Sequence, residues 1–280
     1  MYNSLNNDKN VVSQIFGEHI FFKKQIFKLA IANIQKTYRG AALGWAWAFI
    51  QPCFTIFVYW FAFTIGLRAN RPVINGGGEE FSYFLWLVAG ILPWFYLRDM
   101  LTTGTSSIRS YGYLVTKMSF PVSTIPTFVS LSKVMVNSLL QVVCIALVWA
   151  AGHPPDIYLL QLPYYILMLF IYGTGQTLLF SLLAVMSKDF ANLVRSFTTA
   201  IFWLSGIIWN VDGVKIGWLK SILNINPITY LCNGFRNVYI NKIWFFDQKR
   251  TLYFLVVTLV VYILAFLVYR KVRKDIPDVL

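Results

Sequence analysis

The stretch TYRGAALGWAWAFIQPCFTIFVYWFAFTIGLR (residues 37–68) decides the fold class. No charged residue lies between Arg39 and Arg68. The apolar run from about 43 to 67 exceeds the roughly 20 residues that a helix needs to cross a bilayer core of about 30 Å. Pro52 lies inside this run, where a membrane helix tolerates a bend because neighbouring helices and water satisfy the freed carbonyl. The stretch therefore predicts a first transmembrane helix.

Further apolar runs recur along the chain, at about 81–97, 127–151, 158–186, 194–209 and 252–269. Hydrophobic residues make up 58% of the 280 residues and aromatic residues 18%, which is more than a water-soluble core uses. The sequence predicts an all-α integral membrane protein whose six transmembrane helices form one domain over 43–270.

The formal charge of +13 bears on topology. The cations lie mainly beside the apolar runs, so headgroup contacts explain them better than nucleic acid does, and no nucleic-acid partner is expected. They gather before residue 40 and in the tail 271–280, which places both termini in the cytoplasm and requires an even number of spans. Cations within 210–250 oppose this orientation, but long translocated segments follow the rule poorly.

Two segments are apolar but too short or too interrupted to cross. The N-terminus (1–18) is polar and shows no cleavable signal pattern. In residues 19–42 the apolar side chains recur at helical spacing and the lysines gather on the opposite side, which predicts an amphipathic helix along the cytoplasmic interface. A solvated helix of a soluble protein is the alternative. Half-length apolar pieces at 216–223 and 228–235 predict re-entrant helices in an outer region (210–250) between spans five and six.

The sequence lacks the residue patterns of nucleotide-hydrolysing, metal-dependent and other common enzyme sites. No G-x-x-x-x-G-K-[ST] loop, H-E-x-x-H pattern or paired intramembrane carboxylates occur, and three cysteines show no metal-binding spacing. We expect no catalytic residue, metal or cofactor in this chain. Lys133 is the one ionisable residue noted deep inside a span, where a snorkelling side chain is favoured over an ion relay.

Aromatic residues are concentrated in the first, second and fifth spans. They are explained either as belts at the two membrane interfaces or as the lining of a conduit, because aromatic faces bind sugar rings without tight polar sites. The candidates for a channel lining are Trp45, Phe54, Tyr59, Phe202 and Trp203.

The opening stretch resembles type-2 ABC exporter permeases for cell-surface polysaccharides, in which an aromatic-basic pair precedes an LG-x-x-W segment and a span with proline. Here these are Tyr38 and Arg39, then 43–47, then Pro52. The resemblance continues through GILPWFY (90–96), TKMSFPVSTIP (116–126), SKDFANL (187–193) and NPITYLCNGFRNVYI (226–240). Within the family, VYWFAFTIGLRANRPV (58–73) looks most like wall teichoic acid exporters, with O-antigen and capsule exporters next.

The resemblance implies a homodimer in the bacterial cytoplasmic membrane that carries two ATPase subunits, which bind the ATP and Mg²⁺. It implies a substrate polymer built on a polyprenyl diphosphate lipid. An exporter of a drug or small lipid, or a non-transporting membrane scaffold, is the alternative.

By position, the resemblance also implies roles for particular residues. The helix before Tyr38 and Arg39 matches a cytoplasmic gate, where Lys28, Lys36 and Arg39 would either meet the anionic lipid head or anchor to headgroups. The ATPase-coupling loop is matched by Lys117, Met118, Ser119, Phe120 and Pro121. The outer re-entrant pair is matched by Asn226, Pro227, Tyr230 and Arg236.

Overall fold

A computed structural model of the protein describes residues 11–66, 72–118, 120–247 and 250–280. In chain order its elements are α1 (Val11–Phe21), α2 (Lys23–Tyr38), η2 (Gly44–Ala46), α3 (Trp47–Trp60), η3 (Phe61–Gly66), β1 (Val73–Ile74), β2 (Glu80–Phe81), α4 (Tyr83–Asp99), η4 (Met100–Gly104), α5 (Ser107–Ser110), α6 (Gly112–Met118), α7 (Thr124–Ala150), η5 (Ile157–Gln161), α8 (Leu162–Met186), α9 (Lys188–Leu204), η6 (Val211–Gly213), α10 (Gly217–Ile225), α11 (Pro227–Arg236), η7 (Asn237–Asn241), η8 (Phe245–Asp247), α12 (Arg250–Val272) and α13 (Ile276–Val279).

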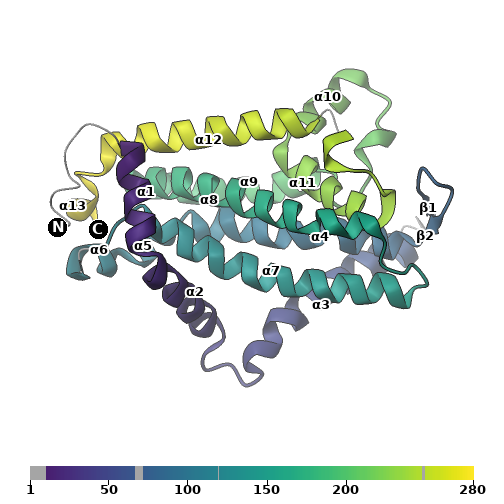
Figure 1. Ribbon diagram of the computed structural model, residues 1–280, viewed down its shortest axis with the longest axis horizontal. Coiled ribbons are helices and arrows are strands. Elements are labelled where there is room, and N and C mark those ends of the chain that lie inside the picture. The colour runs from purple at the N-terminus through teal and green to yellow at the C-terminus, as the bar shows by residue number, and fades with distance from the viewer. Residues whose placement is uncertain (1–10, 67–71, 119, 248–249) are drawn as a thin grey trace.

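Five helical segments of the described chain are long and apolar enough to cross a membrane. They are Gly44–Gly66, Tyr83–Gly104, Thr124–Ala150, Ile157–Met186 and Arg250–Val272. The prediction of an all-α membrane protein is therefore confirmed, and these five coincide with five of the predicted runs. Figure 1 shows α4, α7, α8 and α12 running along the long axis, with α1 and α13 at one end and the antiparallel β1–β2 hairpin at the other. We call these the terminal end and the hairpin end.

The remaining predicted run, 194–209, corresponds to α9, which begins and ends earlier than expected. Its 17 residues are fewer than the roughly 20 of a straight span. The helix stops at Leu204, and Gly206 follows with φ of +60°, a left-handed conformation that favours glycine and turns the chain.

Helical structure also extends beyond two other predicted limits. The second span continues past residue 97 through the π-helical η4 to Gly104, because Met100 and Leu101 are buried and Thr102 donates back to the Arg98 carbonyl. The predicted interfacial helix is two helices that begin at Val11, are separated at Phe22 and end at Tyr38.

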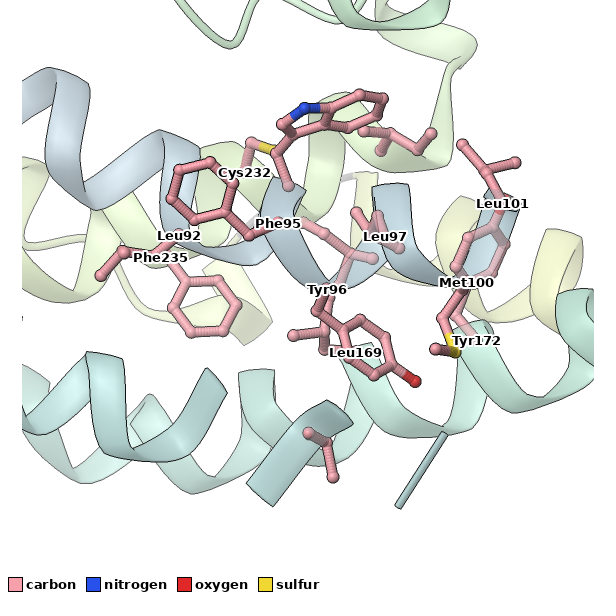
Figure 2. Packing of buried hydrophobic residues seen from close by; sticks show 14 of the residues in the cluster. Leu92, Phe95, Tyr96, Leu97, Met100, Leu101, Leu169, Tyr172, Cys232 and Phe235 are labelled. Atoms are coloured by element: carbon pink, nitrogen blue, oxygen red, sulfur yellow. The ribbon is translucent and has the colours of Figure 1, made fainter. Parts of the chain in front are cut away.

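The core is centred on α4, whose side chains are buried from Leu85 to Leu97. Figure 2 shows Phe95 and Tyr96 of this helix, and Met100 of η4, among side chains of α8 and α11. The Tyr96 hydroxyl lies 2.6 Å from Ser130 Oγ, which lies 2.7 Å from Thr174 Oγ1, so hydroxyl groups join α4, α7 and α8. By contrast, α3 and α12 bury few of their apolar side chains, as expected for surfaces that face lipid or protein.

Candidate functional site

A cluster of three charged side chains lies within the membrane-spanning helices. Lys133 Nζ of α7 lies 2.8 Å from Asp99 Oδ2 at the end of α4, and Arg98 Nη2 lies 3.5 Å from Asp99 Oδ1. The Lys133 side chain is 19% exposed and that of Asp99 25%. One carboxylate thus meets two cations, so the cluster keeps a net positive charge. Because charge is costly inside a membrane, such a cluster points to a functional site.

This cluster lines a cavity of about 170 Å³ between α2, α3, α4 and α7. Tyr38 at the end of α2 and Gln51 in α3 contribute polar atoms, and Asn137 of α7 completes the wall opposite α3. We call this the charged cavity. It is where the predicted gate helix meets the first span.

A second cavity, also of about 170 Å³, lies between α3, α4 and α9. Aromatic side chains form more than half of its lining, beside three threonines and Arg98. The ring of Phe202 lies 5.3 Å from Tyr59 and 5.5 Å from Trp94, and Trp203 lies beside it. We call this the aromatic groove. Thr55, Phe95 and Arg98 line both cavities, so the two are neighbours that share these side chains as a common wall.

The structure brings together three of the five predicted channel residues, Tyr59, Phe202 and Trp203. It does not bring Trp45 or Phe54 to this groove. Trp45 lies 6.0 Å from the Tyr38 ring, and Phe54 is largely exposed on another face of α3.

The sequence interpretation missed the charged cluster. Lys133 was expected to snorkel, but its ammonium group pairs with Asp99 inside the protein. Arg98 and Asp99 directly follow the predicted second span, 81–97, and so were not expected inside a membrane-spanning helix. The signal that could have found them is the apolar pair Met100 and Leu101, which continues the helix beyond the charges.

Of the four predicted gate residues, Tyr38 is the one that lines the charged cavity. It is half-buried. Lys28 and Arg39 are exposed. Lys36 is also exposed, and its ammonium group lies 4.9 Å from the centre of the Tyr111 ring.

The predicted coupling loop lies at the terminal end, where Lys117 and Met118 of α6 are exposed. Phe120 is buried, and its ring lies 5.2 Å from that of Phe22, edge to face, at the junction of α1 and α2. Pro121 is buried beside it, and Ser119 falls outside the described residues. The loop therefore rests directly on the predicted gate helix.

The predicted outer residues begin α11 and form hydrogen bonds between it and neighbouring elements. Asn226 caps α11, with Oδ1 accepting from the Ile228 amide at 2.9 Å, and Pro227 occupies the first turn. The Tyr230 hydroxyl lies 2.9 Å from Thr251 Oγ1 of α12. Arg236 is 1% exposed and donates to the carbonyls of Trp86, Gly206 and Ile207.

Comparison with known proteins identifies the class to which these features belong. Residues 24–240 match the ABC-2 type transporter family. The O-antigen export system permease protein RfbA of Myxococcus xanthus is 23% identical over 219 residues, which cover 78% of this chain and 81% of that protein. A permease of the same name from Klebsiella pneumoniae is 22% identical over 255 residues, covering 89% and 92%. The chain therefore belongs to the ABC-2 type transporter family and is a multi-pass membrane permease rather than an enzyme.

Proposed function

We propose that this chain is the permease of an ATP-driven exporter that moves a polyprenyl-diphosphate-linked cell-surface polysaccharide, O-antigen-like or teichoic acid, out of the cytoplasm. The observation that carries the proposal is that a charged cavity and an aromatic groove lie next to each other and share Arg98 in their walls. The O-antigen export permeases among its relatives support a polysaccharide substrate over a drug or small lipid.

The aromatic groove suits a sliding polymer. Sugar rings pack their C–H faces on aromatic side chains with little directional preference, so successive units exchange places without a tightly bound intermediate. Tyr59, Trp94 and Trp203 offer such faces along the groove. A deep pocket with many fixed polar groups would instead hold one unit and slow its movement.

The charged cavity suits the anionic end of the substrate. A diphosphate enters past Lys28, Lys36 and Arg39 and reaches Arg98 and Lys133, where it competes with Asp99 for the cations. Arginine binds phosphate oxygens through two parallel hydrogen bonds, and the low dielectric of the membrane strengthens them. Arg98, which lines both cavities, then passes the head group toward the groove.

The proposed assembly contains two copies of the chain and two ATPase subunits in the bacterial cytoplasmic membrane. In each copy α9 is a short fifth span, giving six, and α10 and α11 are the outer re-entrant pair, with both termini in the cytoplasm. The exposed apolar faces of α3 and α9 meet across the dimer, so that the aromatic groove becomes part of a shared channel.

Coupling runs through the loop at the terminal end. The ATPase subunit, which binds ATP and Mg²⁺, contacts Lys117 and Met118, and its movement reaches the gate helix through the Phe120–Phe22 contact. Arg109 anchors α5, the helix before α6, to the end of α8. Its Nε and Nη2 atoms donate to the Ala184 and Val185 carbonyls at 2.9 and 2.6 Å. Because α5 is held in place, a displacement of the coupling loop is transmitted to the gate helix.

The test is to co-express the chain with the ATPase encoded beside it, purify through a tag on this chain alone, and measure ATP hydrolysis in lipid with and without polyprenyl-linked glycan. We expect stoichiometric ATPase and glycan-dependent hydrolysis. Met118→Asp should weaken co-purification, whereas Met186→Asp, an exposed methionine at the same end, should not.

Other outcomes distinguish the competing functions. Hydrolysis stimulated by hydrophobic drugs or small lipids but not by glycan would favour an exporter of those molecules. The absence of any bound ATPase would contradict the exporter proposal and favour a scaffold.

A further inference from the structure

A polar pocket of about 420 Å³ opens at the hairpin end of the molecule. Asn233 of α11 and Asn237 and Asn241 of η7 line it, and their four-residue spacing places the three amides along one helical face. Asn241 Nδ2 donates to Asn237 Oδ1 at 2.7 Å, so the amides form a connected row. We call this the asparagine pocket. η7 is π-helical, a conformation found frequently at functional sites.

The amides keep hydrogen-bonding capacity toward the pocket. Asn233 Oδ1 accepts from Arg236 Nη1 at 2.9 Å. Within the described part of the chain, no protein group pairs with Nδ2 of Asn233, Nδ2 of Asn237 or Oδ1 of Asn241, and these atoms are not sealed from solvent. Two donors and one acceptor on residues that line the pocket are therefore left without a partner among the protein groups that the structure describes.

The floor of the pocket is a buried cation. The Arg236 guanidinium lies 3.4 Å from the centre of the Trp86 ring and is held by backbone carbonyls, with no carboxylate partner among the described residues. Because Arg236 covers Trp86, the indole face is closed to a ligand. Arg250 lies at the pocket margin. The pocket therefore offers hydrogen bonds and positive potential rather than an aromatic stacking surface.

We propose that the asparagine pocket binds a saccharide unit of the exported polymer through its hydroxyl groups, an inference that rests on the proposed function. Amide groups donate and accept at once, which matches neighbouring sugar hydroxyls that do the same. A lipid chain would leave the amides unpaired at a cost, and a phosphate would meet a guanidinium already engaged by carbonyls. The volume falls in the usual range for ligand pockets, about 300–1,000 Å³.

The position of the pocket gives it a role distinct from that of the groove. Val73 and Ile74 of the hairpin line it, whereas the charged cavity lies between α2, α3, α4 and α7 and the aromatic groove between α3, α4 and α9. The groove lets sugars slide on aromatic faces, and the pocket holds an emerging unit by directional hydrogen bonds. Such a site reduces backward movement of the exported polymer between successive cycles of ATP hydrolysis.

The test uses the full transporter in cells that make the polymer. A photocrosslinking amino acid is placed at Ile243 on the pocket margin, at Trp203 in the aromatic groove and, as a control, at the exposed Trp218 of α10. After illumination, glycan adducts are detected as periodate-sensitive, high-mass forms of the tagged chain. We expect adducts at Ile243 and Trp203 and none at Trp218.

A second variant tests the amides themselves. Asn241→Leu should lower the adduct yield at Ile243 about two- to tenfold, the effect of losing one neutral hydrogen bond, and leave the yield at Trp203 unchanged. Asn192→Leu, on the exposed face of α9, is the matched control. Co-purification of the ATPase checks that each variant folds and assembles.

The outcomes separate this inference from the function on which it rests. Adducts at Trp203 but not at Ile243, equal adducts at Ile243 and Trp218, or a yield insensitive to Asn241→Leu would overturn the saccharide pocket while the exporter proposal stands. Adducts at neither Trp203 nor Ile243 would overturn both.

Discussion

Lys133 Nζ lies 2.8 Å from Asp99 Oδ2, which joins α7 to α4 inside the membrane-spanning part of the chain. Asp99 keeps a second cation, Arg98, at 3.5 Å. The carboxylate is therefore the shared partner, and removing it affects both cations, whereas removing Lys133 leaves Asp99 with Arg98.

This asymmetry predicts unequal stability losses. Asp99→Asn should destabilise the protein by about 1–3 kcal/mol, between the limits for exposed and buried ion pairs, because two cations lose their partner. Lys133→Gln should cost less. Thermal unfolding of the purified permease in detergent measures the difference, and equal losses would contradict the shared-carboxylate arrangement.

The aromatic groove predicts a contrast between two phenylalanines. Phe202→Ala should destabilise the protein by about 3–5 kcal/mol, because the ring is 5% exposed and packs against Tyr59 and Trp94. Phe54→Ala, at a ring that is 66% exposed, should change stability little. Thermal unfolding measures both, and a similar loss for the two variants would show that a partner covers Phe54.

Gly90 in α4 provides a test of the buried site in which backbone carbonyls hold the Arg236 guanidinium. A Cβ atom at this position would lie 2.3 Å from Arg236 Nη2, a separation that real Cβ atoms do not adopt. We expect Gly90→Ala to displace the buried guanidinium from its carbonyl partners and destabilise the hairpin end by about 1–3 kcal/mol, the cost of unsatisfied buried polar groups. Hydrogen exchange across α11 measures the effect, and Gly66→Ala, where space is open, is the control.

The ion pair at the hairpin end predicts a pH dependence. Lys242 Nζ lies 2.6 Å from Glu79 Oε2, and this hydrogen bond lowers the pKa of Glu79 below its usual 4.5 and raises the pKa of Lys242 above 10.5. The pair therefore stabilises the fold between these values. Its contribution is lost as the pH falls below 4.5 through the folded-state pKa of Glu79, and as the pH rises above 10.5 through that of Lys242.

Lys242→Asn should remove this dependence. Asparagine tolerates the left-handed backbone of Lys242, where φ is +55°, so the variant changes the charge without straining the turn. The melting temperature of the wild-type protein should fall more steeply below pH 4.5 than that of the variant. Parallel curves would mean that the pair contributes nothing.

The Phe120–Phe22 contact predicts uncoupling. If the coupling loop moves the gate helix through these rings, Phe120→Ala should leave ATP hydrolysis by the assembled transporter largely intact and lower polymer export several-fold. Export is measured as surface polymer, and hydrolysis on the purified complex. Phe16→Ala, an exposed ring on α1, is the control. Proportional loss of both activities would instead indicate impaired assembly.

The sequence alone determined the class of protein and most of its membrane-crossing segments. Hydropathy is a local property that a window of about 20 residues reveals, and the family motifs are contiguous stretches. The local signal was weaker at segment ends. It did not show that Met100 and Leu101 carry the second helix onward, or that Gly206 ends α9 before residue 209.

Tertiary structure alone decided which side chains meet. Lys133 reads as a snorkelling residue until α7 packs on α4 and brings it to Asp99, 34 positions earlier in the chain. The Arg236 guanidinium meets Trp86 across 150 positions, which no local pattern encodes. The physical reason is that local hydrophobicity sets which segments enter the membrane, whereas long-range packing of helix faces sets which polar groups share a cavity.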